Sequence, residues 1–300
     1  MTADVTRDTA VRVIRSALDA AGLPVTGDPV PLTGGYSGAA FRVSTPIGSL
    51  GVKLRGDFRP VIAVRVASNV LGARGLAHGG LVVPPLRTEA GWVLALAWVD
   101  GAPLADPTAV DWTDELAGRF GADLGRWLSD VHEVRLSRKR WSDRAVGRYR
   151  DKLGRCRSAN LVDDDLATRV ERLWERSRPA LGPVPLCLIH RDLQAGNVLV
   201  RDGRFAGVID FEQARLADPL YDFVKLTDSV FALHPGIGPA ALAEYGLDPD
   251  APGTRARLAS AFLLEYLSAL VYFHKHGNEP MIEVQRTRLR ELVTGDTGSR

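Results

Sequence analysis

The stretch that decides the fold reads Leu188-Ile189-His190-Arg191-Asp192-Leu193-Gln194-Ala195-Gly196-Asn197-Val198-Leu199-Val200, then Arg201-Asp202-Gly203-Arg204, then Phe205-Ala206-Gly207-Val208-Ile209-Asp210-Phe211. Asp202-Gly203 lies between two apolar β-branched runs, a pattern that predicts a tight β-hairpin over residues 197–210. A hairpin there brings its entry and its exit together. The side chains of Asn197 and Asp210 are therefore predicted at the same end of the ribbon.

A third polar side chain belongs to the same place. Asp192 lies five residues before Asn197, on the loop that feeds that end of the hairpin. Two carboxylates and an amide oxygen are hard ligands that suit Mg²⁺, which takes few protein ligands and keeps several waters. Without a cation, repulsion between the buried carboxylates would be costly. The spacing therefore predicts a magnesium site at the mouth of the hairpin.

A second group of residues, near the N-terminus, suits phosphate. Gly34, Gly35 and Gly38 would let the backbone approach a ligand closely, and Ser37 adds a hydroxyl. Lys53 lies in an otherwise apolar strand beside this glycine-rich run, as a point charge for phosphates would. Taken alone, such a glycine run is more often a plain turn, and a single strand lysine is usually a solvated edge residue.

The rest of the sequence divides into a strand-rich first third and a helix-rich remainder. Hydrophobic spacing predicts helices at residues 8–21 and 61–76, and strands at residues 30–32, 41–43, 50–54 and 92–98. Five further helices are predicted at residues 113–131, 145–155, 163–177, 219–231 and 255–274. This order predicts an α+β protein with two lobes, residues 1–100 and 101–300.

The composition limits the partners and the compartment. The 300 residues are 45% hydrophobic and 25% charged, as in an ordinary globular protein, and a net charge of +2 does not indicate nucleic acid as the main partner. The N-terminus is polar and no run of eighteen apolar residues occurs, so we expect no membrane segment and a cytoplasmic protein. Cys156 and Cys187 lack the spacing of a zinc site or a disulfide framework.

The central stretch resembles a family of kinases. His190-Arg191-Asp192 with Asn197 and then Asp210 is similar to the catalytic and metal-binding loops of the protein-kinase-like fold. The flanking forms, 193–199, Ile209-Asp210-Phe211-Glu212 and Asp218-Pro219-Leu220-Tyr221-Asp222, resemble the aminoglycoside phosphotransferase family of antibiotic and small-metabolite kinases. This resemblance implies a small antiparallel-sheet N-lobe that binds nucleotide. It also implies a larger helical C-lobe with the catalytic loop and the acceptor site.

The resemblance also implies a role for each matching residue. Asp192 would accept the proton of the attacking hydroxyl, and Asn197 and Asp210 would hold Mg²⁺ against the β- and γ-phosphates of ATP or GTP. Lys53 would contact the α- and β-phosphates.

Four further residues receive supporting roles. The carbonyl of Ala97 and the N–H of Val99 would read the nucleobase. Asp222 would brace the catalytic loop from the next helix, without touching substrate. We interpret His190 as a structural residue that anchors the catalytic loop.

The sequence departs from the family pattern at the partner of Lys53. Family members usually carry a glutamate on the helix after the lysine strand, whereas the only acid between Lys53 and Arg87 is Asp57. Three alternatives are open: Asp57, an acid from elsewhere, or a lysine held differently. Arg191 stands where glycine is commonest in the family. Asp210-Phe211-Glu212 lacks the protein-kinase glycine and no Ala-Pro-Glu follows, which argues against a protein kinase.

The acceptor is expected over the helical lobe, near Glu265 and Tyr266. The C-terminus is basic, which tempers a polycationic acceptor and leaves room for a neutral or nucleoside-like antibiotic. The function predicted is antibiotic inactivation by O-phosphorylation of a hydroxyl. Two alternatives are open: a metabolic kinase for a sugar, an amino alcohol or homoserine, and a nucleotide-binding pseudokinase. The donor, ATP or GTP, and the state, monomer or dimer, are open as well.

Overall fold

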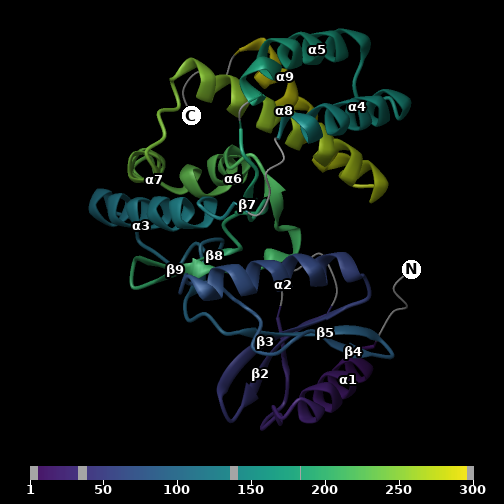
Figure 1. Cartoon of the computed structure of the whole chain (residues 1–300), viewed down its shortest axis with the longest axis vertical. Coiled ribbons are helices and arrows are strands. Elements are labelled where there is room, and N and C mark those ends of the chain that lie inside the picture. Colours follow the sequence, from purple (N-terminus) through teal and green to yellow (C-terminus); the bar gives the residue numbers. More distant parts are fainter. Residues whose placement is uncertain (1–5, 33–38, 136–140, 183, 296–300) are drawn as a thin grey trace. The chain divides into compact units, whose positions relative to one another are not determined.

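The chain forms two compact units and enters each of them twice (Figure 1). The computed structural model describes residues 6–32, 39–135, 141–182 and 184–295. Met1–Thr113 and His190–Arg215 make the first unit, and Asp114–Ile189 and Leu216–Arg300 make the second. The predicted lobes, residues 1–100 and 101–300, follow chain order and stay a prediction. The compact units differ from them because the catalytic stretch returns to the first unit.

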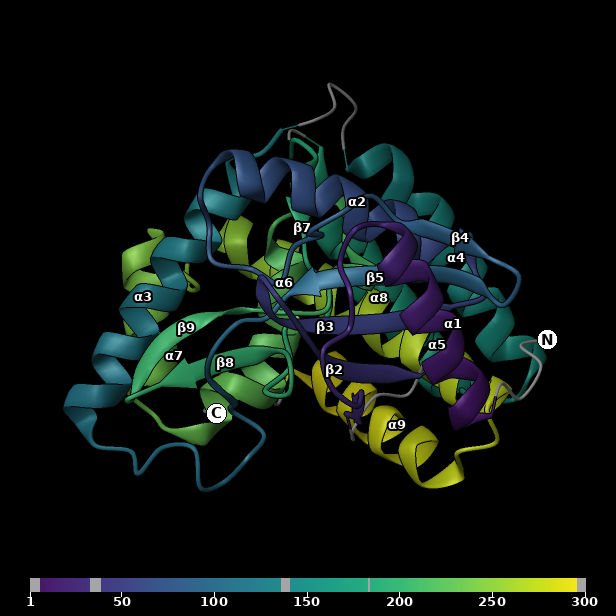
Figure 2. The same ribbon diagram turned by 90° about the horizontal axis from the view of Figure 1, so that it is seen from below.

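A five-stranded antiparallel sheet is the framework of the first unit (Figure 2). Its strand order is β1-β2-β3-β5-β4. In β3, Lys53 lies opposite Leu94 of β5, and Val52 lies opposite Ala95. The strands are β1 (Val30–Pro31), β2 (Ala40–Thr45), β3 (Gly48–Arg55), β4 (Leu86–Thr88) and β5 (Gly91–Ala97).

Two helices cover opposite faces of this sheet, α1 (Arg7–Ala20) and α2 (Phe58–Ala73) (Figure 1). Alternate strand residues face opposite sides. Val52 and Ala95 therefore join the core that α1 covers, while Leu94 packs with the α2 residues Val61 and Val64. Since Lys53 is paired with Leu94, its side chain leaves the sheet on the α2 face.

The predicted hairpin is present in the first unit as β8 (Val198–Arg201) and β9 (Arg204–Val208). Asp202 and Gly203 both have positive φ, 51° and 70°, as a type I′ turn requires. A short strand, β6 (Ala102–Pro103), extends this ribbon to three strands, and a 3₁₀ turn (Phe211–Gln213) follows it. The turn residues therefore predicted the tight hairpin correctly, and the strands also show a register shift between Leu199 and Val200.

The second unit is mainly helical. Its largest core cluster includes Trp174 and Leu186 together with residues of α4, α5, α8 and α9. The free thiols of Cys156 and Cys187 are both buried in this unit. Its elements are α3 (Asp114–His132), α4 (Ser142–Ser158), α5 (Asp164–Ser177), β7 (Cys187–Ile189), α6 (Leu220–Lys225), α7 (Ile237–Tyr245), α8 (Pro252–Lys275) and α9 (Glu279–Thr294), and β10 (Arg215–Ala217) begins at the last residue of the first unit.

Helix α8 is the one described helix long and apolar enough, by length and composition, to cross a membrane. Half of that window is buried inside the structure, as expected for the core helix of a globular unit. The buried side chains of Leu263, Leu264 and Leu267 belong to the main core cluster. We therefore interpret α8 as a core helix.

One predicted helix is shorter than expected. The helix at residues 219–231 ends as α6 at Lys225 and continues as a π-helical turn over Leu226–Val230. Leu226 and Val230 are buried at a spacing of four, which both an α-helix and a π-turn accommodate. Hydrophobic spacing alone could not separate them.

Candidate active site

The mouth of the hairpin brings its two ends together, as predicted. The N–H of Ile209 donates a hydrogen bond of 2.9 Å to the carbonyl of Asn197. Asp210, the next residue, therefore emerges beside Asn197. The type I′ turn at the far end and the register shift between Leu199 and Val200 together set this pairing, so the distance between the two side chains is set locally.

Asp192 is tied to the same mouth through Asn197. The Nδ2 of Asn197 donates to the carbonyl of Asp192 at 2.8 Å and to its Oδ2 at 3.3 Å. Asn197 is buried. Its amide thus fixes both the backbone and the carboxylate of the predicted catalytic residue.

His190 holds this loop through hydrogen bonds and ring packing. Its ring is fully buried, its Nδ1 accepts from the N–H of Asp192 at 3.1 Å, and its Nε2 lies 2.9 Å from the carbonyl of Ile209. An Nδ1 that accepts leaves the proton on Nε2, which then donates to Ile209. The ring also packs edge-on against Phe211, with centroids 4.5 Å apart. The structural interpretation of His190 agrees with these contacts.

Asp210 occupies a left-handed backbone conformation, with φ 69° and ψ 60°. Its Oδ1 lies 2.8 Å from the Nζ of Lys53, an ion pair whose geometry is not that of a hydrogen bond. Burial, the largest single cause, raises the pKa of Asp210, but the surrounding positive groups, Lys53 first among them, together hold that pKa below its ordinary value. Asp210 is thus kept as a carboxylate, the form that binds a cation.

Lys53 has an acidic partner that does not come from α2. Its Nζ donates to Oε1 of Glu212 at 2.9 Å, in addition to the ion pair with Asp210. Asp57 instead caps α2, where its carboxylate accepts from the N–H of Arg59 at 3.1 Å. Of the three alternatives left by the sequence, the structure therefore shows an acid from elsewhere.

The residues at the hairpin mouth fit a magnesium ion. No group of three or more His, Cys, Asp or Glu side chains in the described ranges could hold a metal without other ligands. Mg²⁺ needs fewer, since it is usually held by one or two carboxylates plus substrate phosphates and waters. Asp210 supplies a half-buried carboxylate. Asn197 donates to Asp192 through Nδ2, which makes Oδ1 the atom suited to a cation.

The predicted nucleobase contacts lie at the end of β5. Ala97 is exposed and uses its N–H to donate to the carbonyl of Gly80 at 2.7 Å, while Val99 is half-buried. Their roles stay predictions. The predicted phosphate loop, Gly34, Gly35, Ser37 and Gly38, lies outside the described residues.

In the second unit, Asp222 is fully buried against a histidine. Its Oδ2 lies 3.1 Å from Nε2 of His132, whose Nδ1 lies 2.9 Å from the hydroxyl of Tyr245. His132 comes from α3, Asp222 from α6 and Tyr245 from α7. This set joins three helices, and the bracing of the catalytic loop by Asp222 stays a prediction.

Glu265 and Tyr266 are buried on α8, and both neighbour ionic groups. Oε1 of Glu265 lies 3.3 Å from Nζ of Lys225, and the Tyr266 hydroxyl lies 3.5 Å from Oδ1 of Asp228. Arg288 donates to Asp228 at 2.9 Å, yet burial raises the pKa of Asp228 above its ordinary value. Each carboxylate therefore has a cation of the same unit beside it. Acceptor binding by Glu265 and Tyr266 stays a prediction.

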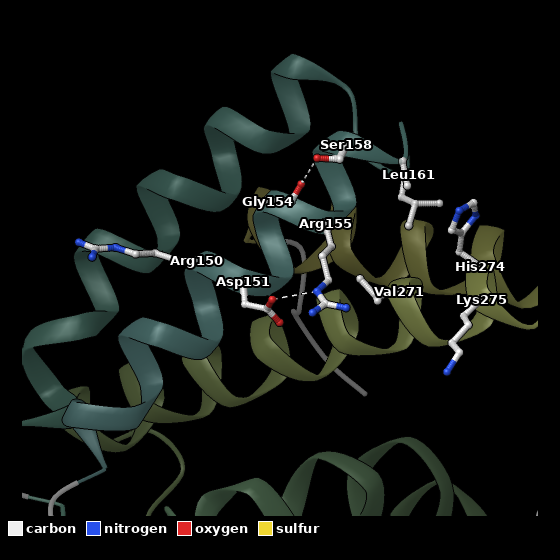
Figure 3. Close-up of a pocket in the computed structure, with 10 residues that line it drawn as sticks. Arg150, Asp151, Gly154, Arg155, Ser158, Leu161, Val271, His274 and Lys275 are labelled. Atoms are coloured by element: carbon white, nitrogen blue, oxygen red, sulfur yellow. Dashed lines mark hydrogen bonds and ion pairs between the residues drawn. The ribbon is translucent and has the colours of Figure 1, made fainter.

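The grooves found in the described residues lie away from these side chains. One, of about 650 Å³, runs between α4 and α8 (Figure 3). Two of its polar contacts lie within α4: Arg155 donates to Asp151 at 2.8 Å and the Ser158 hydroxyl donates to the Gly154 carbonyl at 2.9 Å. A second, of about 840 Å³, lies between α1 and the β4 region. None of the predicted site residues lines either groove.

Two charged residues near Lys53 were not predicted as site residues: Glu212, which accepts from Lys53, and Arg55, which donates to Glu212 at 2.6 Å. Arg55 stands two positions after Lys53, so a strand places both on one face. Glu212 stands two positions after Asp210. The alternation of side chains along a strand could have indicated Arg55. The pairing of Arg55 with Glu212, 157 residues later, could not be inferred from the sequence.

Comparison with known proteins relates the chain to phosphotransferases. Residues 30–259 match a protein family described as the phosphotransferase enzyme family. An aminoglycoside 3'-phosphotransferase of Escherichia coli is 30% identical over 99 residues, which are 32% of this chain and 35% of that protein. The chain thus spans about a third of the length of this curated relative.

Solved structures share the fold over almost the whole chain. An apo thermostable mutant of the aminoglycoside phosphotransferase APH(4)-Ia has a TM-score of 0.70, 16% identity and coverage of 96% of this chain and 100% of its own. The GDP complex of aminoglycoside 2'-phosphotransferase-IIIa has a TM-score of 0.73, 14% identity and coverage of 97% and 99%. A macrolide 2'-phosphotransferase of Brachybacterium faecium has a TM-score of 0.66, 19% identity and coverage of 92% and 97%.

Proposed function

Because the chain belongs to the phosphotransferase enzyme family, we propose that it moves the γ-phosphoryl group of ATP or GTP to a hydroxyl of a small molecule. The observation that carries the proposal is the arrangement at the hairpin mouth. There Asn197 holds Asp192, and Asp210 emerges beside Asn197 and pairs with Lys53. These are the groups that phosphoryl transfer needs, since catalysis of this reaction is mostly positioning and charge neutralisation.

The residues at the hairpin mouth account for each part of the phosphoryl transfer. The acceptor oxygen forms a bond to the γ-phosphorus, the bond to the β–γ bridging oxygen breaks, and nucleoside diphosphate leaves. Asp192 takes the proton of the hydroxyl at its carboxylate, which Asn197 orients. Lys53 holds the phosphates by its ammonium group. Mg²⁺, when bound by Asn197 and Asp210, supplies positive charge to the phosphates.

The acceptor that we propose is an antibiotic. In support, the curated relative of known activity is named an aminoglycoside 3'-phosphotransferase, and similar folds are named as complexes with gentamicin or with ADP and hygromycin B. Macrolide phosphotransferases are among the similar folds as well. The pseudokinase alternative was motivated by the missing helix glutamate, and Glu212 supplies Lys53 with an acidic partner from another segment.

The test is a search for product by mass spectrometry. Purified protein, Mg²⁺ and either ATP or GTP are incubated with a pooled library of antibiotics and hydroxylated metabolites. We expect one antibiotic to gain the mass of one phosphoryl group, and we expect no gain with Asp192→Ala. If the product is instead a phosphorylated sugar, amino alcohol or amino acid, the protein is a metabolic kinase and the proposed antibiotic acceptor is wrong. A product formed equally well by Asp192→Ala would remove Asp192 from the mechanism.

A further inference from the structure

Four charged side chains form a compact cluster on the α2 face of the sheet. Lys53 and Arg55 come from β3, and Asp210 and Glu212 come from the segment after β9. Nζ of Lys53 lies 2.8 Å from Asp210 and 2.9 Å from Glu212. Arg55 donates to Oε1 of Glu212 through Nε at 2.9 Å and through Nη2 at 2.6 Å, and through Nε to Oε2 at 2.9 Å. All four residues belong to the first unit.

The pair of Arg55 and Glu212 is the buried part of the cluster. Both side chains are 8% exposed, whereas that of Asp210 is 33% exposed. A buried carboxylate is stable as an ion only when it is paired and its oxygens are hydrogen-bonded. The fork of a guanidinium satisfies both needs and fixes orientation, which an ammonium group does less well. Glu212 is therefore held mainly by Arg55.

Arg55 balances the negative charge that Glu212 brings to the cluster. Lys53, Arg55, Asp210 and Glu212 sum to zero. If Glu212 stood beside Lys53 alone, the carboxylate would cancel the charge that phosphates need. With Arg55 on the other side of the carboxylate, the set of Lys53, Glu212 and Arg55 keeps one net positive charge. That charge is centred near Lys53, the more exposed of the two cations.

Helix α2 supplies nothing to this cluster. Phe58–Ala73 contains no aspartate or glutamate, and the acid just before it, Asp57, caps the helix. The carboxylate beside Lys53 stands instead on the 3₁₀ turn that begins after Asp210. The same short turn thus fixes the candidate metal ligand and the partner of the lysine.

We propose that Glu212 and Arg55 are positioning residues for Lys53 in nucleotide binding. Glu212 holds the ammonium group, and Arg55 holds Glu212 and compensates its charge. This inference rests on the proposed function, in which Lys53 contacts the phosphates. It replaces the helix glutamate expected from the family resemblance by a strand arginine and a turn glutamate.

A double-mutant cycle on nucleotide affinity tests the inference. Glu212→Gln, Arg55→Met and Lys53→Met are made singly, and the first two are also combined with Lys53→Met. The dissociation constants of a fluorescent ATP analogue and of adenosine are measured with Mg²⁺ present. We expect each single variant to weaken triphosphate binding about tenfold and to leave adenosine binding unchanged. In the Lys53→Met background, Glu212→Gln and Arg55→Met should add less than about twofold.

The controls separate positioning from folding. Glu89→Gln removes an exposed acid of the same unit, after β4, and should leave both affinities unchanged. Arg55→Lys keeps the charge without the fork and should not restore affinity if the bidentate contact matters. Should Glu212→Gln fail to fold, Arg55→Lys with Lys53→Met completes the cycle.

Three results would overturn the inference: additive losses in the double variants, an equal loss of adenosine binding, or triphosphate affinity unchanged in Glu212→Gln. These measurements need no acceptor. If wild-type protein phosphorylates nothing in the library but the cycle shows coupling, the proposed function fails and the positioning of Lys53 stands. If product forms but the effects are additive, the reverse holds.

Discussion

Two residues of the hairpin mouth are held in a backbone conformation that side chains rarely adopt. Arg191 has φ 72° and Asp210 has φ 69°, and they stand directly before Asp192 and directly after Ile209. Such a conformation costs on the order of 1–3 kcal/mol and persists where the surroundings fix it. Here His190 fixes both neighbours, since it hydrogen-bonds to Asp192 and to Ile209. The strained backbone therefore lies at the positions that orient the carboxylates of Asp192 and Asp210.

At this scale the two carboxylates should differ in what they do. We expect Asp192→Ala to reduce turnover by at least about a hundredfold while the affinity for Mg²⁺-nucleotide stays nearly intact, because a base acts after binding. Asp210→Ala should instead weaken nucleotide binding, and only when Mg²⁺ is present. Titration of each variant with nucleotide, with and without Mg²⁺, checks both. Equal behaviour of the two variants would contradict the assignment.

At the scale of elements, α3 and α7 of the second unit run side by side in both views (Figures 1 and 2) and approach each other closely. Gly121 and Gly125 of α3 face α7, and a methyl group on either would meet backbone atoms of Ile237 or Ala241. Two glycines one turn apart thus permit a close helix contact that a larger residue would prevent.

Gly125→Ala should therefore destabilise the protein by about 1–3 kcal/mol, because the backbone of α7 must move to admit the methyl group. Gly118→Ala is the matched control on the same helix. No atom beyond its own helix backbone and chain neighbours lies within 4 Å of that position, so alanine should be neutral or stabilise by up to about 1 kcal/mol. Urea unfolding of the two variants measures the difference. The same sign for both would argue against close packing as the cause.

Helix α2 allows a second prediction, on Asp57. Because its carboxylate caps the helix, Asp57→Ala should lower the free energy of unfolding by about 1 kcal/mol, whereas Asp57→Asn should retain the cap. Neither variant should change nucleotide affinity. Thermal melting and nucleotide titration check the two statements. Weaker nucleotide binding by Asp57→Asn would return Asp57 to the role of lysine partner.

What the sequence could reveal at this scale depended on how local each feature is. The triad of Asp192, Asn197 and Asp210 was predictable because one short hairpin sets its geometry. The partner of Lys53 was not, because Glu212 reaches it across 159 residues of chain. Helix α9 was missed although its buried residues, Ile282, Gln285, Leu289 and Leu292, keep a helical spacing. The basic charge of that segment was interpreted only for what it implies about the acceptor, and no helix was predicted there.

At the scale of the whole molecule, the α+β kinase-like fold and the family were predicted and are confirmed. Similar folds at 14–19% identity extend over nearly the whole chain, although the curated relative matches only part of it. Fold class follows from the order of strands and helices, which survives when individual residues change. The acceptor depends on particular side chains and is therefore a proposal.

The discontinuous first unit leads to a prediction for a fragment. Residues 1–113 contain β3 with Arg55 but lack Glu212, so folding would bury a guanidinium without its carboxylate. Removal of one partner of a buried ion pair costs about 3–5 kcal/mol. We expect this fragment to be unfolded and not to bind nucleotide, as circular dichroism and nucleotide titration would show. A folded fragment that binds nucleotide would contradict a structural need for the returning segment.

The same return has a consequence for how the protein is made. A ribosome adds about 5–20 residues per second. Glu212 lies 157 residues after Arg55, so it is synthesised roughly 8–31 s later. Throughout that interval the two cations of β3 lack their carboxylate partners Asp210 and Glu212. Much of the second unit emerges meanwhile, ahead of the segment that completes the first. A nascent chain thus has no finished nucleotide site until its catalytic loop has been synthesised.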